Sequence, residues 1–335
     1  MNITHRSVLG TWLVLAGAGL LGFASTDGRA TTPPGPEPRP LKLASIPSPS
    51  AFAQITSTRP VSRTRAGSGL VRYGERLLLA QDDAYMLVWM DPRTTPVRTQ
   101  FVALARDPGP LPKAKKPDFE AATLLPDGRL LVMGSGSART RRSFVLLDPQ
   151  TDEFVLADAG PLYDAVATAL GGELNIEGVI PEADGLILFN RGSSAGDNAV
   201  IGVALRVDAP TTVEVKGLTR WHLGEVQGFS HPVALAFTDA TRGPDGQLWY
   251  LAAAEDTPDA ISDGQVVGAV IGVLGAESGS WTPILESDGT PSVRKFEGLV
   301  IDADGAGGWL VTDADSPERP TELCRIALRG LAAAK

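Results

Sequence analysis

Three glutamates, Glu120, Glu177 and Glu297, recur at the same point of a repeated sequence pattern. Each begins a short apolar segment, which is followed by an Asp-Gly turn, a second apolar segment and a small polar loop. Carboxylates that are brought together repel one another, so they need a cation, a proton or a basic partner. A hard cation such as Ca²⁺ is held by carboxylate and carbonyl oxygens. We therefore predict that the three glutamates bind a metal ion, with Ca²⁺ as the candidate; alternatively, each binds backbone donors or pairs with Arg or Lys.

The polar loops that follow the second apolar segments supply further candidates. Arg191 comes directly after such a segment, Arg142 lies beyond another, and Glu255 and Asp313 begin two more of the loops. The guanidinium group suits planar anions such as carboxylate or phosphate. We predict that these four residues bind a ligand. The alternative for the arginines is that they are solvated residues of hairpin loops.

His231 is the candidate catalytic base, because it precedes the first apolar segment of the fourth repeat. The alternative is a structural histidine. The stretch 192–196 matches Gly-x-Ser-x-Gly, but a nucleophile elbow needs a strand before it and a helix after it. Here Ala199–Val203 has the pattern of another strand, so we interpret the match as chance.

The elements that must position these residues are repeated β-sheets. Aligned at Ser68, Glu120, Glu177, Ala234 and Glu297, the repeats lie 52, 57, 57 and 63 residues apart. A four-stranded propeller blade takes about 40–50 residues, and loop insertions account for the rest. We predict an all-β fold, a β-propeller of five blades, or six if residues 208–228 contain another. In a propeller the first strand begins, and the second ends, at the same end of the central channel, so the candidates converge there.

The first fifty residues differ from the repeats. Residues 1–30 contain an uncharged apolar run after a basic residue, which is typical of an export signal peptide. Residues 31–50 are rich in proline and are predicted to be an extended linker. Within the linker, Leu41–Ile46 is predicted to form the N-terminal strand that closes the last blade. Residues 51–335 are predicted to be a single propeller domain, and we expect a periplasmic or secreted protein.

Composition limits the classes of function and partner. The net charge of −9 and the pI of about 5.0 argue against nucleic-acid binding, which requires basic surfaces. After residue 30 no segment has the length and apolarity of a membrane span. We therefore expect no stable membrane insertion after signal removal, and a monomer. The one cysteine, Cys324, excludes an intramolecular disulfide and is predicted to be a buried thiol.

The three repeats that begin Glu120-Ala121, Glu177-Gly178 and Glu297-Gly298, each with a downstream Asp-Gly turn, resemble the phytase-like propellers of bacteria. That group is also described as having esterase-like activity. The segments 253–257 and 268–272 resemble an uncharacterised branch of such exported propellers. The resemblance extends over roughly residues 68–328. It implies a central glutamate cluster, with Ca²⁺ as a cofactor and with ester or phosphoester substrates.

Two functions are compatible with these residues. The first is an exported propeller that binds a small anionic ligand or a partner protein at the channel mouth, through a central cation held by the glutamates. The alternative is a metal-assisted hydrolase of esters or phosphoesters, in which the cation polarises the substrate or activates water. The sequence offers hydroxyls but no evident group that would activate one as a nucleophile, which favours binding.

Overall fold

The computed structural model describes residues 41–192, 198–256, 264–314, 316 and 318–331. The chain divides into two units, Met1–Arg39 and Pro40–Lys335, and the elements below belong to the second. Among the described residues, helix is limited to α1 (Gly160–Leu170) and the short 3-10 helix η1 (Arg139–Arg141). None of the described helices has the length and apolarity that crossing a bilayer requires.

Most strands of the described residues pair antiparallel in groups of four, each mostly made from consecutive strands. The first sheet contains β3 (Gly67–Tyr73), β4 (Arg76–Gln81), β5 (Met86–Asp91) and β6 (Arg98–Ala103). The second contains β7 (Phe119–Leu124), β8 (Leu130–Gly134), β9 (Ser143–Leu147) and β10 (Phe154–Asp158). The third contains β11 (Ile176–Glu182), β12 (Gly185–Asn190), β13 (Asn198–Leu205) and β14 (Val213–His222). The fourth contains β17 (Ala236–Arg242), β18 (Leu248–Asp256), β19 (Gln265–Leu274) and β20 (Gly279–Leu285).

The fifth sheet joins the two ends of the described chain. Its first three strands are β21 (Phe296–Ile301), β22 (Gly307–Thr312) and β23 (Glu322–Arg329). The fourth is the N-terminal strand β2 (Phe52–Pro60), antiparallel to β23. Closure by an N-terminal strand is therefore confirmed.

The strand predicted for this closure was wrong. Residues 41–46 belong to β1 (Leu41–Pro47), which pairs in parallel with β14 and with β20. It therefore joins the outer edges of the third and fourth sheets, inside the region predicted as a linker. The remaining strands, β15 (Glu225–Gln227) and β16 (Pro232–Ala234), form a separate hairpin.

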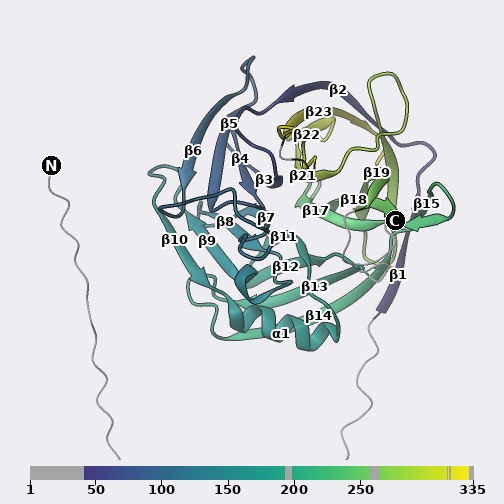
Figure 1. The fold of residues 1–335 in the computed structure, drawn as a ribbon. Helices are drawn as coiled ribbons and strands as arrows, with labels where there is room; N and C mark the ends of the chain where they lie inside the picture. Colours follow the sequence, from purple (N-terminus) through teal and green to yellow (C-terminus); the bar gives the residue numbers. More distant parts are fainter. Residues whose placement is uncertain (1–40, 193–197, 257–263, 315, 317, 332–335) are drawn as a thin grey trace, which may run out of the picture. The chain divides into compact units, whose positions relative to one another are not determined.

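The sheets are arranged around one axis, as a β-propeller requires. The first strand of each sheet contacts the first strands of both neighbouring sheets, so β3, β7, β11, β17 and β21 form a closed ring (Figure 1). The core is divided into clusters, each between two adjacent sheets. Between the third and fourth sheets, for example, Phe237 packs edge-on against Phe189 and Tyr250, with ring centroids 5.2 and 5.3 Å apart. Sheets covered on both faces explain the continuous apolar strands, such as the fully buried β8.

Tight turns join first and second strands at the end opposite the polar loops. Gly128 and Gly246, in two of the predicted Asp-Gly turns, have φ values of +90° and +79°. Glycine adopts this conformation without the steric penalty of a Cβ atom. The turns therefore fix where each second strand starts, and hence which residues reach the opposite end.

Neighbouring first strands approach so closely that Gly178 in β11 has no room for a side chain. A Cβ atom there would lie 2.7 Å from the backbone nitrogen of Ala240 in β17. We expect Gly178→Ala to reduce the free energy of unfolding by about 1–3 kcal/mol, because the backbones must separate. Urea denaturation measures this. Gly217→Ala is the control, since no atom lies within 4 Å of a Cβ there; equal losses in both variants would contradict the packing argument.

Candidate functional site

The predicted glutamates lie where the ladders of the first strands are irregular. The pairing register shifts across Glu120, Glu177 and Glu297, each of which is buried. Such β-bulges redirect one side chain out of the regular alternation. The carboxyl group of Glu120 interacts electrostatically with those of Glu177 and Glu297. The structure therefore brings the three predicted residues together at one end of the axis.

The other two sheets carry hydroxyls at the corresponding positions. Ser68 in β3 donates to Glu120 Oε2 at 2.5 Å. In β17 the register shifts across Thr238, whose hydroxyl donates to the carbonyl of Phe296 at 2.7 Å. The alignment of the fourth repeat at Ala234 was therefore wrong, because Ala234 ends β16. The correct register was visible in the sequence, since Thr238 lies eight residues before the turn glycine, as do all three glutamates.

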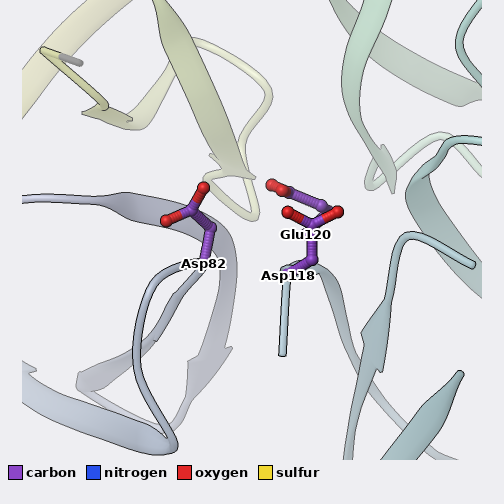
Figure 2. A group of neighbouring side chains, drawn as sticks. All are labelled: Asp82, Asp118 and Glu120. Carbon is purple, nitrogen blue, oxygen red and sulfur yellow. The ribbon is translucent and has the colours of Figure 1, made fainter. Parts of the chain in front are cut away.

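Two aspartates join Glu120 to form a dense acidic group. One carboxylate oxygen from each of Asp82, Asp118 and Glu120 lies within 4.8 Å of the others (Figure 2). Lys116 contacts Asp82, and its Nζ lies 2.8 Å from Asp118 Oδ1. Arg141 Nη1 lies 2.9 Å from Asp118 Oδ2. The ammonium group of Lys116 and the guanidinium group of Arg141 therefore already contact this acidic group.

Burial separates the proton affinities of these acids. It favours the neutral form of Asp118, but Lys116, Ser135 and Arg141 outweigh it and hold the pKa of this carboxyl below its usual range. Burial raises the pKa of Glu120 well above its usual range, and repulsion from Asp118 and Glu177 adds to the effect. Glu120 therefore holds its proton to a higher pH than Asp118 does.

A second group of charges lies beside the first. Arg191 Nη2 lies 2.7 Å from Glu255 Oε1, and its Nη1 lies 3.6 Å from Glu177 Oε1. Lys295 Nζ lies 3.0 Å from Glu297 Oε1. Burial raises the pKa of Glu177 to about 8, although Arg191 opposes the shift. For Glu255 the balance is reversed, because Arg191 and Lys295 outweigh burial and lower its pKa.

We name the charged residues of the two groups together the mouth cluster; its ten members are named at the end of this paragraph. Electrostatic interactions connect its two groups, because Glu120 interacts with Glu177 and Glu297. Buried ion pairs seldom add stability, since desolvation offsets their attraction. Shifted pKa values gathered at one place in a fold are instead typical of functional sites. The cluster contains six acidic and four basic residues: Asp82, Asp118, Glu120, Glu177, Glu255, Glu297, Lys116, Arg141, Arg191 and Lys295.

Comparison with known families assigns the chain to a family but identifies no activity. Residues 63–328 match the model of a family of unknown function, DUF6929. The chain belongs to this family. The DUF6929 match contains all five first strands and the whole mouth cluster, but it begins after β2. No curated protein matches the chain.

Solved structures show only a distant likeness to this DUF6929 chain. Glutaminyl cyclase from Myxococcus xanthus is 11% identical and has a TM-score of 0.47, with 88% of this chain and 100% of that chain covered. The PQQ-bound aldose sugar dehydrogenase from Streptomyces coelicolor is 12% identical with a TM-score of 0.41, covering 84% and 100%. Because both scores are low, we base the fold on the strand pairing described above.

The remaining predicted ligand residues are found in different surroundings. Arg191 and Glu255 belong to the mouth cluster, and Asp313 is buried beside it, donating its backbone N–H to the carbonyl of Lys295. Arg142 instead pairs with Asp164 of α1, at 2.6 Å. The two mouth arginines, Arg141 and Arg191, are both paired with buried or nearly buried acids, whereas the partner of Arg142 is largely exposed.

His231, the predicted base, lies on the surface in the loop of the β15–β16 hairpin. Its Nδ1 lies 3.0 Å from the hydroxyl of Ser230, and its Nε2 lies 3.7 Å from Asp256 Oδ1. The side chain is 58% exposed. The Gly-x-Ser-x-Gly match lies mostly outside the described residues. The structure thus gives His231 an acidic neighbour but no contact with the mouth cluster among the described residues.

Sequence reasoning missed Asp82, Lys116 and Asp118. Asp118 is two residues before Glu120 on the same strand entrance, and Asp82 directly follows β4. Asp118 lies where a first strand begins and Asp82 where a second strand ends, and these are the positions expected at the same end of the propeller as the glutamates. Neither position is acidic in every repeat, which is why the repeat pattern did not reveal them.

Proposed function

We propose that the mouth cluster binds a cation, either a divalent metal ion such as Ca²⁺ or the ammonium group of a small ligand. The observation that carries the proposal is the excess of acidic side chains, six against four, in a buried cluster. Away from water, unbalanced negative charge must be relieved by a proton or by a cation. The raised pKa values of Glu120 and Glu177 indicate that protons relieve it in the unliganded protein.

The best set of ligands for a metal ion is Asp82, Asp118 and Glu120. Their oxygens are close enough to contact one ion, and oxygen is the donor that Ca²⁺ requires. Lys116 touches two of the three acids, so an arriving cation competes with its ammonium group. This competition favours a weak site. We also propose that the protein is exported as a monomer, and weak Ca²⁺ sites are typical of extracellular modules.

Cation binding is expected to release protons and to become tighter as the pH rises, because Glu120 must lose its proton to become a ligand. Calorimetric titration with CaCl₂, and separately with methylammonium chloride, in two buffers of different ionisation enthalpy measures both effects. Glu120→Gln should abolish the proton release. Glu153→Gln, at an exposed position just before β10, is the control. Binding of neither cation, or release unchanged in Glu120→Gln, would contradict the proposal.

Hydrolysis of esters or phosphoesters is the second candidate, consistent with the resemblance to phytase-like propellers. It is favoured by the grouping of Asp82, Asp118 and Glu120, because a cation held there would polarise an ester oxygen. A panel of ester and phosphoester substrates, with and without Ca²⁺, tests this candidate. Turnover that Ca²⁺ stimulates and Glu120→Gln removes would support hydrolysis, whereas cation binding without turnover would leave binding as the function.

A further inference from the structure

A cavity of about 690 Å³ lies outside the mouth cluster, at the outer part of the second sheet. It is bordered by η1, by the end of β10 and by the start of α1. Its volume is within the range of sites that hold small molecules. Arg139, Thr140 and Arg142 are among the polar residues that line it, and Tyr85, Leu156 and Pro161 are among the apolar ones.

Several donors of this wall are unused. Among the described residues, the side chains of Arg139, Thr140 and Ser143 make no hydrogen bond or ion pair with the rest of the protein. The Ser143 hydroxyl and Arg142 Nε are buried and have no hydrogen-bond partner. Both atoms are covered by protein, so they do not face the cavity directly. The donors that a ligand in the cavity meets are the exposed side chains of Arg139 and Thr140 and the guanidinium nitrogens of Arg142 other than Nε.

Two aspartates at the cavity, Asp158 and Asp164, balance the formal charge of its two arginines, but neither holds an arginine tightly. Asp164 accepts from Arg142 Nη1 at 2.6 Å, but its side chain is 72% exposed, so the pair contributes little. Asp158 Oδ1 accepts from the backbone N–H of Gly160 at 2.8 Å. The start of α1 itself adds no free donor, because Pro161 has no N–H and the next two N–H groups donate to Ala159. The donors open to a ligand are therefore the side chains of Arg139, Arg142 and Thr140.

We propose that this cavity binds a small molecule that carries an oxyanion, either a carboxylate or a phosphate, on an apolar body. Arg139 and Arg142 hold the oxyanion, since guanidinium groups suit such planar acceptors. The hydroxyl of Thr140 donates to it, and the apolar body lies against Leu156 and Pro161. The anionic ligand that the sequence predicted for the mouth is thus assigned to a separate site, independent of the cation.

Titration of the full chain with benzoate, phenyl phosphate and uncharged benzyl alcohol, followed by calorimetry, tests the proposal. Benzoate or phenyl phosphate should bind, and their relative affinity distinguishes carboxylate from phosphate; benzyl alcohol should not bind. Arg142→Gln should weaken binding by about tenfold or more, because charge-assisted hydrogen bonds are lost. Asp164→Asn should strengthen it several-fold, because a competing acceptor and a repelling charge are removed.

Arg106→Gln is the matched control, because Arg106 is exposed and does not line the cavity, and it should leave the affinity unchanged. Asp164 lies on the surface, so Asp164→Asn remains informative even if Arg142→Gln fails to fold. Equal affinity for benzyl alcohol would overturn the proposal, as would no change of affinity in Asp164→Asn. Titration of the same variants with Ca²⁺ distinguishes the two proposals. If the protein does not bind Ca²⁺ but still binds the oxyanion, only the cation site is contradicted.

Discussion

Glu177→Gln is expected to stabilise the protein at pH 8 to 9 and to flatten the dependence of its stability on pH. In the native state the pKa of Glu177 is about 8, against 4.5 for the free side chain, chiefly because the carboxyl is buried. As the pH rises from 4.5 to 8, the unfolded chain releases this proton and the native state keeps it, so the wild-type protein loses stability. The difference in pKa corresponds to on the order of a few kcal/mol.

Glutamine resembles the protonated acid, because it is uncharged and still offers an oxygen to Asn175 Nδ2, which donates to Glu177 Oε1 at 2.6 Å. Urea denaturation at a series of pH values measures the effect. Glu153→Gln, at the exposed position just before β10, should leave the pH profile unchanged. A Glu177→Gln profile parallel to that of the wild type between pH 5 and 8 would show that Glu177 is ionised throughout.

Lys116→Met is expected to destabilise the protein at neutral pH by about 3–5 kcal/mol, because it removes a cation from buried acids. Asp82 and Asp118 have side chains that are 12% and 4% exposed, and Lys116 contacts both. Arg141 remains, but it contacts only Asp118 of the two. The loss should be smaller in acid, where protonation removes the repulsion. Thermal and urea denaturation measure the change.

Addition of Ca²⁺ should restore part of the stability that Lys116→Met removes. Without the ammonium group of Lys116 the ion has no competitor for the three carboxylates, and an ion that binds the native state stabilises it. Lys115→Met, at the exposed neighbouring position, is the matched control and should change neither the stability nor the effect of Ca²⁺ on it. If Lys116→Met unfolds no more easily than Lys115→Met, the ammonium group is not needed by the acids. If Ca²⁺ restores nothing, the acidic group does not hold the ion.

Much of the fold was predictable, because its signals are local. Apolar segments joined by Asp-Gly turns specify hairpins, and their repetition specifies sheets around an axis. The identity of the closing strand was not predictable, since Leu41–Pro47 and Phe52–Pro60 are both strands and only tertiary pairing distinguishes them. Local sequence does not encode which edge a strand joins.

The candidate site was predictable only where it repeats. Glu120, Glu177 and Glu297 share one position, but Asp82 and Lys116 come from two different loops that meet only in the folded chain. Arg142 shows the opposite failure: it follows Arg141 directly, yet the two side chains contact acids on different elements, Asp164 and Asp118. Adjacent residues of a loop point in different directions, and sequence alone does not give those directions.

The pairing of β2 with β23 has a consequence for biosynthesis. These strands lie far apart in the sequence, at Phe52–Pro60 and Glu322–Arg329, so the ribosome must synthesise all the residues between them before they can meet. Joining such distant segments is slow, because a long loop must close first. Lys295 and Glu297 arrive with the same late sheet. Nascent chains therefore lack a finished mouth, and ligand affinity appears only once maturation is complete.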